Sequence, residues 1–443
     1  MAQEQEYDRE KTPKVYYLNF KKMNSKEQNS SKKIGQEALN FSVFKTIRDF
    51  AVANKPTIPV YCVRPHAIKR AAKFFVNNFT HSKYDSSILY SVKSNSDRLV
   101  LQNLFESGIS KFDVASLFEI KLINELFAKK AKMFFMHPVK SREAIKSAYF
   151  DYNIRDFSLD SFDELEKILE VTKNAKDLNL HVRLAISNSH SAIDLSGKFG
   201  ILPSGATALV RKTRAVAKKL GICFHVGSQC MDPIEYRNAI NTAKEVIKKA
   251  RVSLDVLDVG GGFPSLYPSM MPMPMHSYFE EIFDAIQQAE FSSNCEIWCE
   301  PGRALVAEAV SLLVRVEARK QNMLYINDGT YGGLFDAGFP AFIYPTQAIR
   351  IKNPKTLDRE KTAFGFYGPT CDSMDCMKGP FSLPENIAEG DYIEIGQLGA
   401  YSRSIRTEFN GFGEVMQIDI DEEPIESMYI NIEHQEENLG KKI

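Results

Sequence analysis

The sequence has no net charge, no long apolar run and few cysteines. Lys plus Arg and Asp plus Glu both number 56, so no net field attracts nucleic acid or an anionic membrane. No stretch reaches the run of about 18 apolar residues that spans a bilayer, and the N-terminal residues lack the apolar core of a signal peptide. Since 44% of the residues are apolar and 25% are charged, the composition predicts a globular cytoplasmic protein that binds neither nucleic acid nor a membrane.

Cysteine is too sparse to hold the fold together. The seven cysteines form an odd, thinly spread set in 443 residues, which argues against a disulfide framework. Cys295 with Cys299 and Cys371 with Cys376 lack the C-x-x-C spacing and matching histidines of a zinc site, so no metal is predicted. The stretch "GFYGPTCDSMD" (365–375) then places a free Cys371 next to an aspartate in a loop rich in glycine and proline. This stretch alone leaves the role of Cys371 open.

Between residues 87 and 303, short runs of apolar, β-branched or aromatic residues recur at spacings that leave room for helices. The eight predicted strands lie in "SILYSVK" (87–93), "KFDVAS" (111–116), "MFFMHP" (133–138), "RDFSLD" (155–160), "HVRLAI" (181–186), "CFHVGS" (223–228), "VLDVGGG" (256–262) and "EIWCEPGR" (296–303). Strands alternating with helices in this way predict a (β/α)8 barrel of the α/β class. A doubly wound sheet, the alternative, needs a glycine-rich turn after the first strand, whereas here the glycine cluster follows the seventh.

Two of the intervening segments indicate helices directly. Apolar residues fall on one face at a 3.6-residue period from Ala206 to Leu220, which predicts a helix over that range. The stretch "SFDELEKIL" (161–169) begins with Ser161 and has Glu164 three residues later. This is the pattern of a capping box, in which each side chain accepts a hydrogen bond from the other residue's backbone. A helix is therefore predicted to begin at Ser161.

After residue 305 the pattern changes to short strands separated by Gly, Pro, Asn and Asp. The predicted strands lie in "VSLLVRVEA" (310–318), "MLYIND" (323–328), "FIYPTQAIRI" (342–351), "KTAFGFY" (361–367), "DYIEIG" (391–396) and "GEVMQIDID" (413–421). We therefore predict an N-terminal extension (1–40) with a strand that joins the β-domain, a barrel (41–305), an all-β domain built as a β-barrel or sandwich (306–432), and an acidic tail (433–443).

In a (β/α)8 barrel the chemistry collects where the strands end. The residues of interest at the predicted strand ends are Lys93, Asp113, His137, Asp160, Arg183, His225, Gly260, Gly261, Gly262, Glu300 and Arg303. So many charged groups on one rim would be costly if unpaired, which favours a binding site over a set of loop caps. At the end of an apolar strand, the amine of Lys93 is expected to lose its charge and become nucleophilic, with a surface lysine on a buried stem as the alternative.

Several of these features suit one cofactor. The three glycines offer backbone N–H groups for a phosphate after the seventh strand, and a tight turn is the alternative explanation. "EPGR" (300–303) supplies a carboxylate for a cationic ring nitrogen and a guanidinium for a phosphate, although an ordinary salt bridge would explain them equally well. With the amine of Lys93 and the flat ring of His225, they suit pyridoxal phosphate (PLP), which needs an amine, phosphate donors and an acidic partner for its pyridine nitrogen.

The order of the motifs resembles that of one known family. "YSVKSN" (90–95), "FDVAS" (112–116) with "FEI" (118–120), "FHVGSQC" (224–230), "LDVGGGFP" (257–264), "EPGR" (300–303), "NDGTYGG" (327–333), "GPTCDSMD" (368–375), "GAY" (399–401) and "FNGF" (409–412) are similar to the motif series of the ornithine decarboxylase-type, fold type III PLP-dependent decarboxylases. The match runs in order from about residue 55 to about residue 415. The family's architecture, an alanine racemase-like PLP barrel with a β-domain, coincides with the one predicted above.

The resemblance implies roles for the barrel residues. Lys93 would carry the aldimine, His225 would stack on the PLP ring, and Glu300 would pair with the pyridine nitrogen. Ser228, the three glycines, Arg303 and Tyr401 would hold the phosphate. Asp113, Glu119 and Arg183 would form a supporting charge shell around the lysine and the ring.

The resemblance also gives Cys371 a role. In this family, the Cys-Asp pair enters the active site of the partner subunit, so a homodimer with shared active sites is implied. Cys371 would protonate the Cα carbanion left by CO2 loss, which suits a thiol near neutral pH. Asp372 would bind the distal amine of the substrate, with Tyr331, Asp336 and Phe409 around it.

The implied reaction is the decarboxylation of a basic amino acid, with L-ornithine to putrescine in polyamine biosynthesis first. L-Lysine or a related diamino acid is the second choice of substrate. A non-catalytic regulatory paralogue is the alternative from another class of protein. Because such paralogues tend to lose active-site groups, the retention of Lys93, His225, Glu300, Cys371 and Asp372 favours an enzyme.

The chain departs from the family pattern in two places. After "DGTYGG" the family carries a Tyr-Asp pair, whereas this chain reads "LFDAGFPAFIYP" (334–345) with Phe339 near the position of that aspartate and Asp336 as a candidate substitute. Arg403 and Arg406 stand where family members mostly have small residues. Substrate identity is therefore less strongly implied than the type of reaction.

Overall fold

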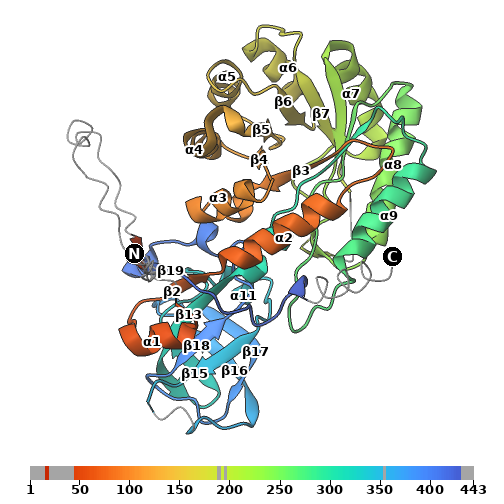
Figure 1. Ribbon diagram of the computed structural model, residues 1–443. Helices are drawn as coiled ribbons and strands as arrows, with labels where there is room; N and C mark the ends of the chain where they lie inside the picture. The colour runs from red at the N-terminus through yellow and green to blue at the C-terminus, as the bar shows by residue number, and fades with distance from the viewer. Residues whose placement is uncertain (1–14, 19–43, 187–190, 194–196, 353–355, 431–443) are drawn as a thin grey trace, which may run out of the picture. The chain divides into compact units, whose positions relative to one another are not determined.

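The structure, a computed structural model, describes residues 15–18, 44–186, 191–193, 197–352 and 356–430. The chain divides into two compact units, whose elements Figure 1 labels. The barrel unit consists of Ala67–Glu308, Gly399–Ser404 and the described part of Glu426–Ile443. The β unit consists of the described part of Met1–His66, Ala309–Leu398 and Ile405–Ile425. Within the described ranges, no helix is both long enough and apolar enough to cross a membrane.

The barrel unit contains a closed barrel of eight parallel strands, which confirms the predicted architecture. In order around the barrel the strands are β3 (Ser86–Ser91), β4 (Lys111–Val114), β5 (Lys132–Phe135), β6 (Asp156–Leu159), β7 (Asn179–Arg183), β9 (Lys219–Cys223), β11 (Val256–Asp258) and β12 (Glu296–Cys299). Each predicted segment contains or overlaps one of them. The strands form apolar runs because helices cover them outside and side chains fill the inside. Leu89, Phe134 and Trp298 belong to one of the buried clusters.

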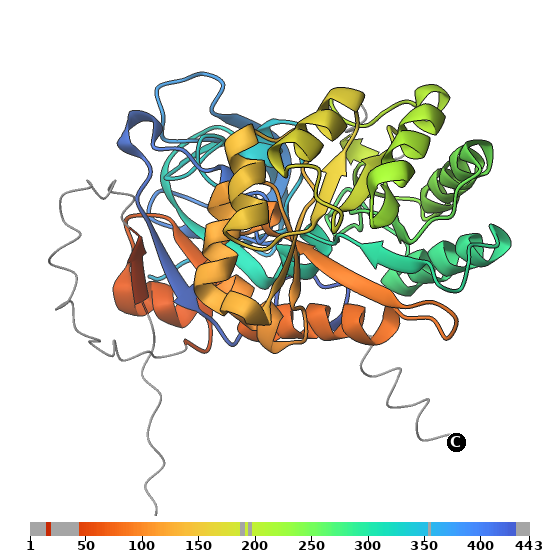
Figure 2. The same cartoon turned by 90° about the horizontal axis from the view of Figure 1, so that it is seen from above.

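The helices of the barrel unit lie around the strands, as the two views in Figures 1 and 2 show. They are α2 (Pro65–Asn78), α3 (Arg98–Glu106), α4 (Leu117–Phe127), α5 (Arg142–Phe150), α6 (Phe162–Val171), α7 (Pro203–Val216), α8 (Ile234–Ala250), α9 (Met275–Gln288) and α10 (Arg303–Val306), with the 3-10 turns η1 (Val92–Ser94), η2 (Ala128–Lys130) and η3 (Ala307–Ala309). A short ribbon pairs β8 (Ser191–Ile193) with β10 (Ser228–Cys230).

The helix predicted from Ala206 to Leu220 is too long. Helix α7 ends at Val216, and Leu220 lies in β9 opposite Leu180 of β7. Leu220 is apolar because it is a buried residue of the barrel wall. Its position happens to match the 3.6-residue period of α7, so the pattern included it in the helix. A periodicity argument cannot separate these two causes when a helix and a buried strand are only two residues apart.

Helix α6 begins after Ser161, as predicted, but only half of the capping box forms. The hydroxyl of Ser161 accepts a hydrogen bond from the backbone N–H of Glu164 at 3.2 Å. The carboxylate of Glu164 instead forms an ion pair with the buried Lys140 at 2.9 Å and a second one with Lys167 at 2.5 Å. A buried ammonium needs an anionic partner more than a helix N–H does, because burial of an unpaired charge costs more.

The β unit is built on a curled, mixed sheet of nine strands. They are β1 (Val15–Leu18), β2 (Val60–Val63), β13 (Val310–Lys320), β14 (Met323–Ile326), β15 (Thr346–Ile349), β16 (Lys361–Tyr367), β17 (Cys376–Pro384), β18 (Tyr392–Ile395) and β19 (Val415–Asp419). β19 runs parallel to β2 and β14 parallel to β16, and β1 pairs antiparallel with β19. The unit also contains α1 (Ile47–Asn54), α11 (Phe335–Gly338) and η6 (Phe409–Gly411), while η5 (Arg403–Ile405) lies where the chain passes from one unit to the other.

The structure differs from the predicted boundaries. The barrel is predicted to begin at residue 41, but the described residues up to His66 belong to the β unit, because β2 pairs with β13 and β19. The β-domain is predicted to run from 306 to 432, but Gly399–Ser404 and the residues from Glu426 belong to the barrel unit. β17 was not expected, because the Gly379–Pro380 pair inside it reads as a turn signal. Most of the predicted extension (1–40) and the tail (433–443) lie outside the described residues.

Candidate active site

The barrel topology brings the predicted polar residues to one rim. Because all eight strands run parallel around a closed barrel, their carboxyl ends meet on the same side. Lys93 lies in η1 directly after β3, and Asp113 lies in β4. Arg183 ends β7, and Glu300 directly follows β12. Lys93 and Glu300 are 207 positions apart in the sequence. The closed barrel brings them and the residues between them to the same rim.

The amine of Lys93 is held by a hydroxyl from the strand that precedes it and a carboxylate from the adjacent strand. Its Nζ donates to Asp113 Oδ2 at 2.8 Å and to Ser91 Oγ at 3.3 Å. Ser91 Oγ also donates to the same oxygen of Asp113 at 2.8 Å, so the serine joins the two charged groups. Ser91 was not predicted as a site residue. Its place in the last position of β3, two residues before Lys93, is the signal that could have identified it.

The charge of Lys93 differs from the expectation. Although 42% of the side chain is open to solvent, the ammonium lies among buried groups. Burial by itself lowers the pKa of Lys93, but the carboxyl groups of Asp113 and Glu300 outweigh it, and the pKa is raised above its ordinary value. The expected neutral amine is therefore wrong for the protein alone, because two acidic groups from other strands stabilise the cation.

Glu300 is a buried carboxyl with spare hydrogen-bonding capacity. Its side chain is 8% exposed, and among the described residues its Oε1 has no hydrogen-bond partner. Burial, and then the neighbouring carboxyl groups of Asp258 and Asp113, raise the pKa of Glu300 well above its ordinary value. Burial likewise raises the pKa of Asp258 to about 6. A buried acceptor crowded by like charges favours the approach of a cationic group.

The glycines after β11 form a turn that no other residue could occupy. Gly260 and Gly262 have positive φ values of 71° and 106°. A Cβ atom on Gly260 would lie 1.9 Å from the carbonyl oxygen of Phe224, and one on Gly262 would lie 2.7 Å from that of Gly227. Gly260 N–H donates to Asp258 Oδ1 at 2.9 Å, so the turn is bound to the carboxyl group that neighbours Glu300. The bare backbone thus approaches the rim more closely than a side chain would permit.

Arg303 joins the other predicted phosphate ligands. It is only 4% exposed and donates from Nη2 to Ser228 Oγ at 3.4 Å. Its guanidinium lies 5.1 Å from the ring centre of Tyr401. A second hydrogen bond, from Nη1 to the hydroxyl of Tyr267 at 2.7 Å, involves a residue that was not predicted. A buried guanidinium beside hydroxyl groups and a glycine turn is an arrangement that binds phosphate.

His225 is held as a neutral ring. Its Nδ1 accepts a hydrogen bond from the backbone N–H of Gly227 at 3.0 Å, which requires that nitrogen to be unprotonated. Burial, together with the positive charges of Arg183 and Lys93, lowers the pKa of His225 well below its ordinary value. A Cβ atom on Gly261 would lie 2.9 Å from Nε2 of this ring, so glycine leaves room for the imidazole.

The remaining predicted rim residues make local contacts. Glu119 is buried near the start of α4 and accepts a hydrogen bond from Ala115 N–H at 2.7 Å, and burial raises its pKa to about 7. Asp160 accepts one from Gly200 N–H at 2.9 Å, so it anchors a loop. The ring of His137 packs edge-on against Phe199 at 5.1 Å.

The predicted substrate residues of the β unit form a second cluster. Tyr331 donates its hydroxyl hydrogen to Asp372 Oδ2 at 2.5 Å, and its ring lies 4.8 Å from that of Phe409. Cys371 is exposed, and its backbone N–H donates to Asn410 Oδ1 at 3.1 Å. A hydrogen bond from Met374 N–H, and then the one from Tyr331, lower the pKa of Asp372. The carboxylate therefore keeps its charge at neutral pH.

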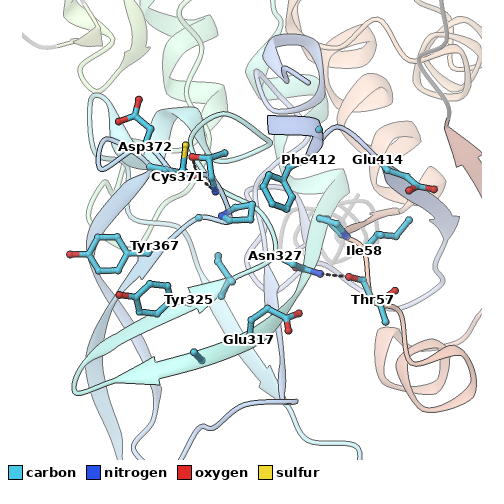
Figure 3. A pocket seen from close by; sticks show the side chains of 18 of the residues that line it. Thr57, Ile58, Glu317, Tyr325, Asn327, Tyr367, Cys371, Asp372, Phe412 and Glu414 are labelled. Atoms are coloured by element: carbon cyan, nitrogen blue, oxygen red, sulfur yellow. Dashed lines mark hydrogen bonds between the residues drawn. The ribbon is translucent and has the colours of Figure 1, made fainter. Parts of the chain in front are cut away.

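Cys371 and Asp372 also border a pocket in the β unit. The pocket has a volume of about 770 Å³, and Figure 3 shows both residues at one end of it and Tyr325 and Tyr367 further along. All seven cysteines of the chain, Cys371 included, are free thiols. The exposed position of Cys371 leaves its sulfur accessible to a reacting group.

The structure places Asp336 within helix α11 and Phe339 directly after it. Asp336 is 6% exposed and is not among the residues that line the pocket. Phe339, which occupies the position near the family's second acidic group, follows α11 with 73% of its surface exposed.

Two buried aspartates that were not predicted bind the backbone of the loops that carry Tyr331 and Cys371. Asp375 accepts hydrogen bonds from the backbone and hydroxyl of Thr330, at 2.7 and 3.0 Å, and from those of Thr370, at 3.1 and 2.7 Å. It therefore joins the loop of Tyr331 to the loop of Cys371. Asp328 accepts from Gly333 N–H at 3.2 Å and pairs with Arg406 at 2.8 Å. The glycines packed against these carboxylates are the signal that could have identified them.

Comparison with known proteins identifies the family. The family described as "Pyridoxal-dependent decarboxylase, pyridoxal binding domain" matches residues 66–307. The chain is 31% identical to the lysine/ornithine decarboxylase of Selenomonas ruminantium over 74% of this chain and 81% of that protein. It is 32% identical to antizyme inhibitor 2 of Xenopus laevis over 73% of each chain. Among solved structures, the lysine/ornithine decarboxylase of Vibrio vulnificus complexed with cadaverine has a TM-score of 0.71 and 27% identity over 84% of this chain and 98% of the other.

The chain belongs to the pyridoxal-dependent decarboxylases, a family of carboxy-lyases that act with PLP. Its described residues fit this cofactor. The unpaired buried oxygen of Glu300 suits the pyridine nitrogen, and the glycine turn with Arg303 suits the phosphate. The ornithine and lysine decarboxylases among its relatives indicate a basic amino acid as the class of substrate.

Proposed function

We propose that this chain decarboxylates a basic amino acid, with L-ornithine, which yields putrescine, as the first substrate and L-lysine as the second. The observation that carries the proposal is the rim itself. There, Lys93 pairs with Asp113 while the buried carboxyl of Glu300 keeps an unpaired oxygen. When bound, PLP supplies an electron sink for the carbanion that CO2 loss creates. The residues of the chain supply attachment, orientation and proton transfer.

In this proposal the rim residues bind the cofactor. Lys93 holds it by its amine, and Asp113 orients that amine through their 2.8 Å hydrogen bond. Glu300 accepts from the pyridine nitrogen. Ser228, the glycines 260–262, Arg303 and Tyr401 hold the phosphate. The neutral ring of His225 offers a flat face without a competing positive charge, and Arg183 belongs to the supporting charge shell.

The β-unit cluster would act on the substrate. Asp372 keeps its charge and binds the distal ammonium, with Tyr331 and Phe409 bordering the same cluster. Cys371 donates a proton to Cα after CO2 loss, which its exposure and its family counterpart support. Asp336 remains a candidate for a second grip on the ammonium, although its burial in α11 speaks against direct contact.

We further propose a homodimer in which each subunit lends its Cys371 loop to the other's barrel rim. Several large apolar side chains of the β unit are exposed, namely Phe335, Phe339, Met374, Phe409 and Phe412. Apolar groups of this size are often covered at a protein interface when they gather in one place. In a two-fold dimer each subunit would contribute its Cys371 loop to the partner's rim and receive the partner's loop at its own rim, so both active sites would be complete.

The proposal is tested by CO2 release from ornithine, lysine, arginine and diaminopimelate with the purified holoprotein. We expect the highest kcat/KM with ornithine, then lysine, and a loss of turnover on the order of 1,000-fold or more with every substrate in Lys93→Ala. Preference for diaminopimelate, which is itself a diamino acid but carries a carboxylate beside its distal amine, would contradict ornithine or lysine as the substrate. Turnover of none by a PLP-loaded protein would contradict the enzymatic function altogether.

A non-catalytic regulator is the second candidate, since the chain is as similar to an antizyme inhibitor as to the decarboxylases. The two candidates differ in colour. An enzyme with PLP attached to Lys93 should be yellow and lose its colour on borohydride reduction. A regulator that does not bind the cofactor should be colourless and take up no added PLP.

A further inference from the structure

The segment Gly399–Ser404 lies directly against the turn that carries Lys93. Asn95 Nδ2 donates to the carbonyl oxygen of Gly399 at 2.8 Å. Tyr401 N–H donates to the carbonyl oxygen of Ser94 at 2.9 Å. All of these residues belong to the barrel unit, so the contacts are made within one compact body. Two parts of the candidate site that are about 300 residues apart in sequence, the Lys93 turn and the Tyr401 segment, are thereby joined through the backbone.

An ion pair closes this contact at its far end. Arg403 Nη1 binds Asp97 Oδ2, and the two side chains are 20% and 10% exposed. Asp97 is also the N-cap residue of α3, and its other carboxylate oxygen accepts a hydrogen bond from Leu99 N–H at 2.9 Å. Asp97 N–H in turn donates to Asn95 Oδ1 at 2.9 Å. Arg403 therefore binds the residue at which the Lys93 turn ends and α3 begins.

Both ends of the cofactor site depend on this arrangement. The amine of Lys93 lies at the end of a flexible four-carbon stem, and the backbone of the turn sets where that stem begins and so which positions the amine can reach. Tyr401, two residues before Arg403, carries the ring on which the guanidinium of Arg303 lies at 5.1 Å. If the turn and the segment shift apart, the lysine and the phosphate ligands no longer match one rigid cofactor. A polar pair with little exposure resists such a shift more than surface ion pairs do.

We propose that Arg403 is a positioning residue for the cofactor. Through Asp97 it locks the Lys93 turn to the Tyr401 segment and so sets the spacing between the attachment point and the phosphate ligands. The inference rests on the proposed roles of Lys93 and Tyr401. It also explains why an arginine stands at this position, where the family pattern has a small residue.

The test measures the rate at which the holoprotein loses PLP on dialysis. Arg403→Met keeps the length of the side chain and removes its charge. Asp97→Ser keeps a good N-cap for α3 and removes the carboxylate. We expect each variant to lose PLP roughly 5 to 30 times faster than the wild type, and the double variant to lose it no faster than either single one, because one interaction is removed in all three. Arg403→Lys should restore most of the retention.

A matched control is available beside the pair. Arg98 follows Asp97 and forms an ion pair with Glu125 on the surface, where both side chains are more than half exposed. Arg98→Met should leave PLP loss unchanged. Wild-type PLP retention in Arg403→Met with normal thermal unfolding would overturn the proposal, and so would fully additive effects in the double variant. If Arg403→Met fails to fold, the comparison of Arg403→Lys with Asp97→Ser decides in the same way.

The proposed function can fail separately. Borohydride reduction followed by peptide mapping of the wild-type protein identifies the lysine that holds PLP. A labelled lysine other than Lys93 would refute the assignment of Lys93, whatever the Arg403 variants do. Labelled Lys93 together with an Arg403→Met variant that retains PLP normally would refute the positioning role alone.

Discussion

Glu300 on the barrel rim and Asp372 in the β-unit loop are both carboxyl groups, yet their environments change their acidity in opposite directions. Burial and neighbouring acids raise the pKa of Glu300, whereas hydrogen bonds from Met374 N–H and Tyr331 lower the pKa of Asp372. The rim thus favours a ligand that brings its own positive charge into a buried place. The loop presents a permanent negative charge near the surface, which suits an ammonium arriving from water.

The two regions also differ in how they are supported. On the rim, functional groups contact one another directly, as Lys93 and Asp113 do at 2.8 Å. In the β unit, Cys371 is exposed, and its loop is held by a hydrogen bond from Thr370 to the buried carboxylate of Asp375. We therefore expect the rim to hold a bound cofactor in a fixed geometry, and the loop to meet a substrate that binds and leaves. Four predictions test this contrast.

The largest effect is expected at the rim. Lys93→Ala removes the amine that we propose holds PLP, so turnover should fall on the order of 1,000-fold or more. Steady-state CO2 release measures it. Lys111→Ala, which removes a lysine at the start of β4 rather than at the strand ends, serves as the control and should retain its activity. Comparable loss in both variants would argue against the rim as the site.

A smaller effect is expected from the loop. Asp372→Asn removes the charge that we propose binds the distal ammonium, so kcat/KM for ornithine should fall roughly 30- to 1,000-fold while PLP stays bound. Asp336→Asn is the matched variant and should have a similar effect only if Asp336 contacts the same ammonium. If Asp372→Asn turns out nearly silent, the basic-substrate assignment fails, and the contrast drawn between the two carboxyl groups loses its functional meaning.

Mixing two inactive proteins tests whether rim and loop come from different subunits. Lys93→Ala has an intact loop and Cys371→Ala an intact rim. After subunit exchange, half of the dimers should be mixed, and each mixed dimer should have one complete site, which restores about a quarter of the wild-type activity. No recovery despite demonstrated exchange would mean that the cysteine acts within its own chain.

The smallest effect concerns the stability of the protein without cofactor. Burial raises the pKa of Glu119 to about 7, whereas the unfolded carboxyl ionises near 4.5. The folded state therefore binds more protons between these values, and the free energy of unfolding falls as the pH rises from about 4.5 to about 7. Glu119→Gln should remove this penalty and stabilise the protein at pH 8 by on the order of 3 kcal/mol at most, with no gain at pH 4.5.

Urea unfolding at both pH values measures this difference. Glu125→Gln, on the exposed side of the same helix α4, is the control and should change stability little at either pH. Equal stabilisation by Glu119→Gln at the two pH values would show that burial of the charge is not the cause.

The sequence by itself determined the barrel and most of the candidate site residues. The eight strands could be predicted because parallel strands buried on both faces form short apolar runs, and this pattern is local. Lys93, Glu300 and the three glycines could be selected because strand ends are visible in the same pattern. Gly260 and Gly262 belong here too, since a run of glycines already signals backbone that no side chain can enter.

Tertiary structure decided what depends on groups brought together from distant positions. The pKa of Lys93 is raised rather than lowered because Asp113 and Glu300 arrive from other strands, and no local pattern contains that information. β2 belongs to the β unit because its partners, β13 and β19, come about 250 and 350 residues later. Tyr267, Asp375 and the pair of Arg403 with Asp97 were missed for the same reason. Electrostatic and hydrogen-bond energies depend on separation in space, whereas the periodicity that reveals helices and strands depends on separation along the chain.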